Sequence, residues 1–428
     1  MSMIEYPKLR ETISRRTLPN GLEVIVVHKP FHAQHYAFFA TRYGGMDLRF
    51  EQNGQWKDTP AGIAHYLEHK MFDTEEGSAT QELAKNGAVD NAFTSNSVTA
   101  YFFECTEKFY DSLRVLLRFV SVPYFTEESV AREQGIIAQE IRMTHDDPEW
   151  RIYKNLLDCL YEKNPVRIPV AGTEESIKGI TPKTLYDCHS AFYTPSNMVL
   201  VCVGNIELDK VCEAAEEILP KDGGEMIRRD YGTEESLIPS VRETELEMEI
   251  SMPMFLTGFK CTPPSRGEDL LRENIIGDMA CDVLFGDSSP LFNRLYEEGH
   301  ISGSLGGSYD ILPDAAYLYV GCDAKDPHFV SEEIIKEAQR LTEEGIDETF
   351  YRQIRRATYG QMLRSLNSFE NIAVSLAEGH FRGFDYFDFP AVFESVTKAD
   401  IEDFLRRTIV PEHSAISIIR PFGAQKEN

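Results

Sequence analysis

The most informative stretch of this chain is Ala61-Gly62-Ile63-Ala64-His65-Tyr66-Leu67-Glu68-His69-Lys70-Met71-Phe72. It contains the pattern H-x-x-E-H, which reverses the order of the zinc-binding pattern H-E-x-x-H. On a helix, positions i and i+4 lie one turn apart on the same face, so His65 and His69 are spaced to share one metal ion. Glu68 projects close to that face, where a carboxylate can take a proton from a metal-bound water. The alternative is an ordinary helix that carries these residues by chance.

A catalytic zinc site needs three protein ligands and one open position. A helix is predicted for residues 126–142, because Thr126 is a favourable N-cap and acidic residues follow it in the first turn. Glu133 and Glu140 are seven positions apart, almost two turns, so they share one face of this helix. A solvated acidic face is the alternative, but the apolar residues between them favour a partly buried side.

The order His65-x-x-Glu68-His69 followed by Glu133-x6-Glu140 resembles the insulinase/pitrilysin zinc peptidases, the inverzincins. The resemblance covers nearly the whole chain. It implies that Zn²⁺ is held by His65, His69 and Glu140. It also implies that Glu133 supports the site from behind, where carboxylates orient metal ligands. Glu68 is then the catalytic base.

A second match is the segment Gly87-Ala88-Val89-Asp90-Asn91-Ala92-Phe93-Thr94-Ser95, followed by Thr99-Ala100-Tyr101. It resembles the edge strand that pairs with the substrate backbone in this family. Its aromatic and β-branched residues also favour a strand on intrinsic grounds. The resemblance therefore implies that the substrate-binding residues are Asn91, Ala92, Phe93 and Thr94.

The chain contains an internal repeat with a constant offset: 397 − 181 = 216 and 411 − 195 = 216. In each half, a threonine precedes a predicted helix, which leads to a proline turn and an apolar strand. We predict domains at residues 1–220 and 241–428, joined by a Pro- and Gly-containing charged linker at about 220–240. Mixed antiparallel strands and helices indicate an α+β class. The resemblance implies two homologous α/β rolls that form half of a clamshell, with the metal site in the first only.

Composition fits two domains with real cores, because the chain has 428 residues, of which 42% are hydrophobic. The formal net charge of −27 argues against nucleic-acid binding. We expect no membrane span and no signal peptide. The eight cysteines are scattered without metal-ligand spacing. This usage is typical of buried thiols in a reducing cytoplasm, so a cytoplasmic location is predicted.

The second half departs from the family pattern. Many members carry there an arginine and a tyrosine that hold the substrate carbonyl opposite the zinc. In this sequence Tyr296 stands at the arginine position and Ser302 near the tyrosine position, while Arg294 lies two residues too early. The resemblance is strongest to the YmfH-like subunits of bacterial two-gene pairs. It implies a zinc metallo-endopeptidase subunit that cleaves peptides or small unstructured polypeptides in a closed chamber.

The missing pair predicts a heterodimer with a paralogous subunit that lacks H-x-x-E-H but supplies the arginine and tyrosine. One alternative is a homodimer that uses other donors. Further alternatives are a non-catalytic assembly subunit and a zinc-binding scaffold. Metal content and peptide turnover, measured with and without the partner, separate these possibilities.

Overall fold

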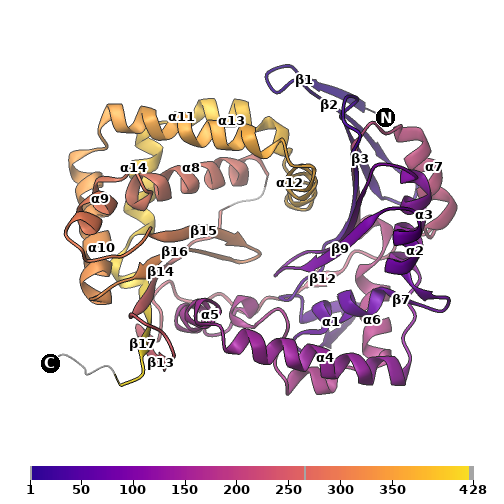
Figure 1. Ribbon diagram of the computed structural model, residues 1–428, viewed down its shortest axis with the longest axis horizontal. Coiled ribbons are helices and arrows are strands. Elements are labelled where there is room, and N and C mark those ends of the chain that lie inside the picture. The colour runs from indigo at the N-terminus through magenta and orange to yellow at the C-terminus, as the bar shows by residue number, and fades with distance from the viewer. Residues whose placement is uncertain (1, 265–266, 424–428) are drawn as a thin grey trace. The chain divides into compact units, whose positions relative to one another are not determined.

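The computed structural model describes residues 2–264 and 267–423 (Figure 1). Each half of the chain contributes a mixed β-sheet with helices on both faces. The predicted α+β class with two homologous domains is confirmed. Contacts group the described residues into two compact units. Unit 1 comprises Met1–Ile141, Ile168–Tyr231 and Leu363–Phe387, and unit 2 comprises Arg142–Arg167, Gly232–Met362 and Asp388–Asn428. Each unit therefore includes one segment from the other half of the sequence.

The sheet of unit 1 has the strand order β1-β2-β3-β11-β4-β10-β9. β11 runs parallel to β3, and the other neighbours pair antiparallel. Asn20 and Gly21 lie in the turn that joins β2 to β3, and Gly21 has the positive φ (86°) that such turns require. The strand bounds are β1 Ser2–Tyr6, β2 Glu11–Thr17, β3 Glu23–His28, β4 His35–Thr41, β9 Val89–Thr94, β10 Thr99–Cys105 and β11 Met198–Gly204.

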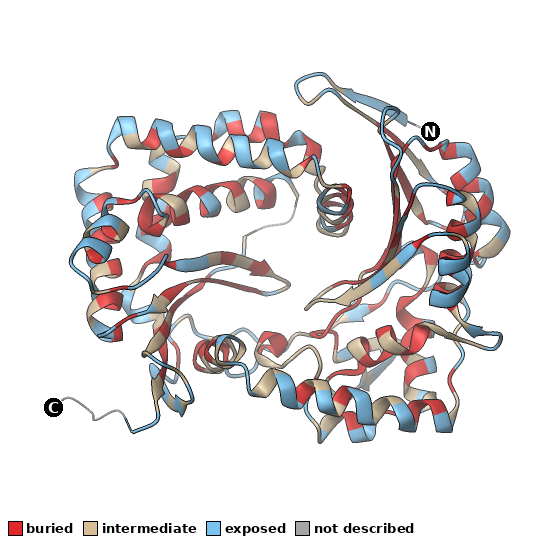
Figure 2. Cartoon of the chain, viewed as in Figure 1, coloured by how far each residue is buried: buried red, intermediate tan, exposed pale blue. Residues whose placement is uncertain are grey.

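Helices cover both faces of this sheet, which explains why the whole of β11 is buried (Figure 2). One face packs against α1 (Ile63–Met71), α2 (Ala79–Lys85), α3 (Phe109–Ser121) and α7 (Leu208–Ile218). The opposite face packs against α12 (Phe369–Arg382), which comes from the second half of the sequence. The strand β9 ends the sheet, so one side of its backbone is open to a further strand.

Unit 2 repeats this arrangement with the strand order β13-β17-β14-β16-β15. Its parallel pair is β13 with β17. The strands are β13 Glu243–Met248, β14 Met254–Cys261, β15 Gly306–Leu312, β16 Ala315–Asp323 and β17 Ser414–Pro421. One face carries α8 (Glu268–Phe285), α10 (Pro327–Glu344) and α14 (Lys398–Thr408), and the other carries α5 (Pro148–Leu160) from the first half. Also present are α9 (Pro290–Glu297), α11 (Glu348–Ser365) and α13 (Phe389–Ser395).

The internal repeat appears as equivalent elements in the two units. Thr181 caps α6 (Pro182–Phe192) and Thr397 caps α14, each through a capping box. A short 3₁₀ turn follows each helix, at Pro195–Asn197 and at Pro411–His413. The strands β11 and β17 then begin at positions 198 and 414, which keeps the offset of 216 (414 − 198).

The segment between the halves is anchored along its length. Its short strand β12 (Arg228–Arg229) pairs with β5 (Arg49–Gln52), which also pairs with β6 (Gln55–Asp58). Arg229 forms a buried ion pair of 3.0 Å with Asp47 in unit 1.

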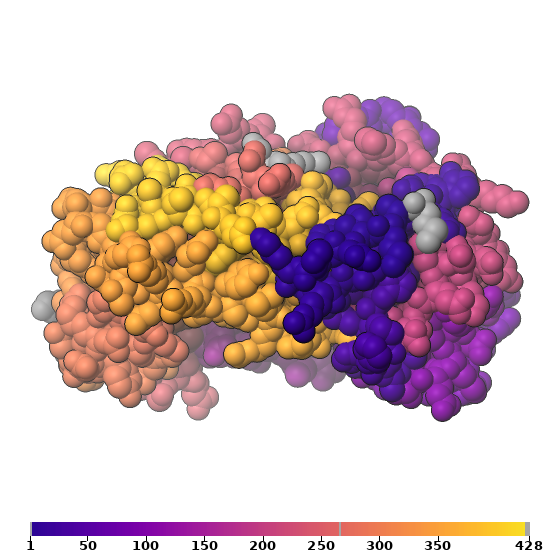
Figure 3. All heavy atoms as spheres, turned by 90° about the horizontal axis from the view of Figure 1, so that it is seen from above, coloured from indigo at the N-terminus to yellow at the C-terminus, as the bar shows by residue number. Residues whose placement is uncertain are grey.

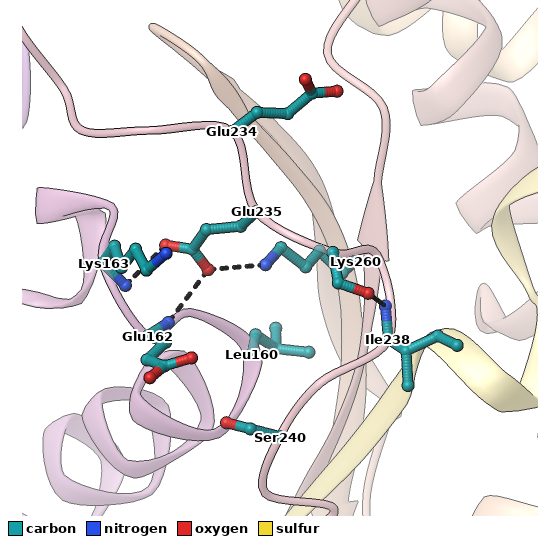
Figure 4. Close-up of a pocket in the computed structure, with 9 residues that line it drawn as sticks. Leu160, Glu162, Lys163, Glu234, Glu235, Ile238, Ser240 and Lys260 are labelled. Carbon is teal, nitrogen blue, oxygen red and sulfur yellow. Dashed lines mark hydrogen bonds and ion pairs between the residues drawn. The ribbon is translucent and has the colours of Figure 1, made fainter.

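Glu235 anchors the next part of the segment within unit 2 (Figure 4). Its carboxylate pairs with Lys260 at 2.8 Å and accepts hydrogen bonds from the backbone N–H groups of Glu162, Lys163 and Asn164. These groups border a pocket of about 290 Å³.

The N-terminal strands lie at the molecular surface (Figure 3), and β1 is exposed along most of its length. Within the described part of the chain, no helix is both long and apolar enough to cross a membrane. The cytoplasmic location stays a prediction.

Candidate metal centre

The helix α1 places His65 and His69 side by side, with ring centroids 4.6 Å apart. Gly62 precedes the helix with φ 91°, and a Cβ atom there would lie 2.4 Å from the carbonyl oxygen of Ala171. The start of α1 therefore requires glycine, both for its backbone conformation and for the close approach of this neighbouring loop. The opposite face of α1 is fixed in the core by Leu67, which is fully buried.

A second helix, α4 (Glu127–His145), brings carboxylates to the two histidines. Its N-terminus is capped by Thr126, whose Oγ1 accepts from the Ser129 N–H at 3.1 Å, as predicted for a threonine N-cap. Its inner face is held by a buried stripe that includes Ile137 and Ile141. The hydroxyl of Tyr66 in α1 donates to the backbone oxygen of Val130, which ties the two helices together beside the site.

The three predicted ligands converge on one point. An Oε1 atom of Glu140 lies 3.4 Å from His65 Nε2, and its Oε2 atom lies 3.7 Å from His69 Nε2. The candidate ligand atoms of all three residues lie within 4.8 Å of one another. Elsewhere in residues 2–264 and 267–423, no group of three His, Cys, Asp or Glu side chains converges in this way. Two imidazoles and one carboxylate are a donor set that catalytic zinc sites use, so the residues fit this metal.

Glu133 lies behind His69 rather than among the ligands. Its Oε1 atom is 3.1 Å from Nδ1 of His69. A proton on Nδ1 that bonds to this carboxylate leaves the lone pair on Nε2, which faces Glu140. Glu133 therefore selects the tautomer and orientation in which His69 can bind a metal.

The charges of the site act on its pKa values. Burial lowers the pKa of His69, but the hydrogen bond to Glu133 and the nearby negative carboxylates outweigh burial, so the net pKa is raised. The hydrogen bond with His65 holds the pKa of Glu140 below its usual value. A carboxylate that stays ionised is the form that binds a cation.

Glu68 is placed apart from the ligand set. It is buried, with 8% of the residue exposed, and its Oε2 atom accepts a hydrogen bond of 2.6 Å from the Thr94 hydroxyl. Glu68, the predicted base, projects from the same helix as the two histidines, and its carboxylate bonds to the neighbouring strand β9.

The four residues predicted to bind substrate lie on the edge strand β9. Ala92 directs its backbone N–H to the open side, where it donates to Asn91 Oδ1 at 2.9 Å. Phe93 points to the face of the sheet that carries α12, within 6.0 Å of Phe38 by ring centroids. Thr94 points to the opposite face, toward α1. A further strand could therefore pair with β9 directly beside Glu68.

Three contacts of the site were not predicted from the sequence. Tyr66 bonds to α4, Thr94 bonds to Glu68, and Lys70 is completely buried and paired with Asp73. The first two join residues far apart in the chain, so no local pattern could indicate them. A lysine directly after the last histidine, inside an apolar run, was an available signal for a buried ion pair.

Comparison with known proteins places these features in one family. A sequence model described as Insulinase (Peptidase family M16) matches residues 52–174, and one described as Peptidase M16 inactive domain matches residues 179–358. The chain is 34% identical to a protein of Bacillus subtilis (strain 168) that carries the name uncharacterized zinc protease YmfH, over 98% of this chain and 99% of that protein.

Solved structures agree with this match. An M16-like peptidase from Alicyclobacillus acidocaldarius superposes with a TM-score of 0.92 at 33% identity, over 96% of this chain and 98% of that one. The periplasmic protease PqqL of Escherichia coli has the same fold at 16% identity and a TM-score of 0.75, and the match spans 98% of this chain but 48% of PqqL. The chain belongs to the insulinase (M16) family of zinc peptidases, and YmfH is a relative over its full length.

Proposed function

We propose that this chain is the zinc-bearing subunit of a metallo-endopeptidase that hydrolyses peptides or small unstructured polypeptides. The convergence of His65, His69 and Glu140, with Glu68 on the same helix, carries this proposal. The family membership supports it, because the full-length relative is named a zinc protease.

The three ligands would hold Zn²⁺, which in such a site polarises the scissile carbonyl and lowers the pKa of a bound water. Glu68 takes the proton of the attacking water and passes it to the leaving amine. Glu133 keeps His69 in its binding tautomer throughout, because its hydrogen bond is made behind the ring.

The substrate backbone adds to β9 as a further strand. The N–H of Ala92 is available for this pairing once the side chain of Asn91 moves aside. Main-chain pairing gives affinity with little dependence on sequence, which suits an enzyme for unstructured peptides.

A second chain completes the site. In unit 2, Arg294 is held by Glu333 at 2.8 Å, and Tyr296 stands half-exposed where the family pattern has arginine. A paralogous subunit with an arginine and a tyrosine would supply the donors that hold the substrate carbonyl. The match to 48% of PqqL supports an assembly of two such chain lengths. A homodimer with other donors is the second candidate.

The test is metal analysis combined with peptide turnover for Glu68→Gln, with Glu75→Gln as the control. Glu75 is exposed, follows α1 in the sequence and is not among the converging ligand residues. We expect Glu68→Gln to keep zinc and to lose about two or more decades in rate, because an amide cannot act as base. Full activity in a zinc-replete Glu68→Gln protein would refute the role of Glu68. Zinc binding without turnover in the wild type, with and without a partner, would favour the non-catalytic scaffold.

A further inference from the structure

We propose that Thr94 is a positioning residue that fixes the carboxylate of Glu68 and couples it to the strand that binds substrate. This inference rests on the proposed peptidase function. The resemblance places Thr94 among the substrate-binding residues, and this inference adds a second role for its side chain, which acts through Glu68.

The contact itself is short and sheltered. The Thr94 hydroxyl donates to Glu68 Oε2 at 2.6 Å, and Glu68 is almost completely buried. A hydrogen bond to a charged carboxylate in such surroundings is stronger than one at the surface, so it selects one side-chain rotamer. Because the bond engages Oε2, the other oxygen, Oε1, is left for the proton of the attacking water.

The hydroxyl is itself held in place. Thr94 pairs with Thr99 across the β9–β10 hairpin, and their Oγ1 atoms are 3.4 Å apart. Thr99 is fully buried and donates to the backbone oxygen of Tyr43 at 2.8 Å. The donor to Glu68 therefore sits on a rigid hairpin rather than on a loop.

The backbone of Thr94 faces the position of the substrate. In an antiparallel strand, the residues whose N–H and C=O groups point to one side recur every second position. Ala92 directs its N–H to the open edge, so Thr94 directs its backbone groups to that edge as well. One residue thus offers its main chain to the incoming peptide and its side chain to the base.

Thr94 links the binding of the substrate strand to the orientation of Glu68. Pairing of a peptide with β9 would fix Thr94, and Thr94 would fix Glu68 relative to the bond that is cleaved. A displacement of about 1 Å at a catalytic group can cost on the order of 100-fold in rate. The hydroxyl should therefore affect turnover more than substrate binding.

The test compares Thr94→Val, which removes the hydroxyl at nearly constant shape, with Thr94→Ser, which keeps it. Thr80→Val is the matched control, because the exposed Thr80 donates to Asp90 at 2.7 Å near the other end of β9. All are assayed in the active form, whether the chain alone or with its partner.

We expect Thr94→Val to lower kcat by about 10–100-fold, with KM changed by less than about 3-fold and zinc content unchanged. Thr94→Ser should restore kcat to within a few-fold of wild type, and Thr80→Val should match wild type. In the Glu68→Gln background, Thr94→Val should cause no further loss, because the two residues act as one unit. A crystal structure of zinc-free Thr94→Val should show Glu68 displaced or in several rotamers.

Equal kcat for Thr94→Val and wild type, or a further loss on top of Glu68→Gln, would overturn the inference. A crystal structure of zinc-free Thr94→Val in which Glu68 keeps its wild-type position would also overturn the inference. If the wild-type protein binds zinc but hydrolyses no peptide, alone or with a partner, the proposed peptidase function is wrong. The crystal structures then still show whether the Thr94 hydroxyl positions Glu68.

Discussion

The Oε1 atom of Glu133 lies 3.1 Å from the Nδ1 atom of His69, on the side of the ring that faces away from the other ligands. The same helix presents Glu140 to the Nε2 side of this ring, at 3.7 Å. One helix therefore supplies both the carboxylate that would bind the metal and the carboxylate that orients a neighbouring ligand. Two glutamates on one face thus contact opposite sides of the same imidazole, and mutation can test their proposed roles separately.

Glu140→Gln should lose zinc on dialysis, because an amide lacks the charge of the carboxylate ligand. Glu133→Gln should retain more zinc and cost about 10–100-fold in affinity or turnover, as is typical when a group behind a ligand is changed. Glu128→Gln, on an exposed turn of the same helix, is the control. Metal analysis after dialysis decides. Loss of zinc from Glu133→Gln but not from Glu140→Gln would show that Glu133 is the metal ligand and that Glu140 supports the site.

Ala92→Pro tests the edge strand. Proline has no N–H, and it is tolerated at a sheet edge where the N–H is not part of the ladder; that of Ala92 points to the open edge and donates to Asn91 Oδ1. We expect a stable, zinc-binding protein whose KM rises by about 10-fold, which corresponds to one lost hydrogen bond of roughly 1.4 kcal/mol. Ala92→Ser keeps the N–H and is the control. An unchanged KM in Ala92→Pro would exclude main-chain pairing at this residue.

The repeat and the site helices were predictable because their signals are local. Thr181 and Thr397 cap equivalent helices, and the H-x-x-E-H spacing places its three residues on one turn of α1. The partner helix of the metal site was predictable from its N-cap and the spacing of Glu133 and Glu140. These features depend on residues that lie within two turns of one another.

The exchange of helices between the units could not be predicted in this way. Residues 142–167 belong to unit 2 and residues 363–387 to unit 1, although each lies in the other half of the sequence. Both α5 and α12 are amphipathic, and an amphipathic helix does not indicate which of two similar sheets it covers. Only the packing of each helix against a particular sheet, seen in the structure, shows which unit the helix belongs to.

Among the described residues of unit 2, no second group of three His, Cys, Asp or Glu side chains converges as in unit 1. At an offset of 212, which pairs Leu83 with Leu295 and Gly87 with Gly299, His65 falls opposite Gly277. A Cβ atom at Gly277 would lie 2.4 Å from the ring of Tyr309. A larger side chain at position 277 would therefore require the ring of Tyr309 to move. The sequence shows the glycine but not the ring that packs against it.

Glu235 should control stability in acid. Burial raises the pKa of this carboxyl, but its hydrogen bonds with Lys260 and three backbone N–H groups outweigh burial and lower the pKa to about 2. The folded pKa lies below the usual 4.5, so the stabilisation is complete above about pH 4.5 and is lost as the pH falls toward 2.

Glu235→Gln should therefore lower the melting temperature at pH 7, where Lys260 is left buried without its partner. The difference from wild type should shrink between pH 4.5 and 2. Thermal melts followed by circular dichroism across this range measure it, and the exposed neighbour Glu234 provides the control variant Glu234→Gln. A constant difference at every pH would show that the ionised carboxylate is not the source of the stability.

We expect a paralogous subunit to supply the carbonyl donors that this chain lacks. The purified chain should hydrolyse peptides poorly alone and gain activity with a paralogue that lacks H-x-x-E-H but has the arginine and tyrosine. The physical reason is that Arg294 is engaged by Glu333, and one donor to the substrate carbonyl is worth about 10²–10³ in rate. The assay compares this chain, the paralogue and their mixture on one peptide. Removal of the paralogue's arginine or tyrosine should abolish the gain, and Glu68→Gln in this chain should abolish it as well. Comparable turnover by this chain alone would refute the shared site and favour the homodimer, and it would leave the zinc peptidase proposal intact.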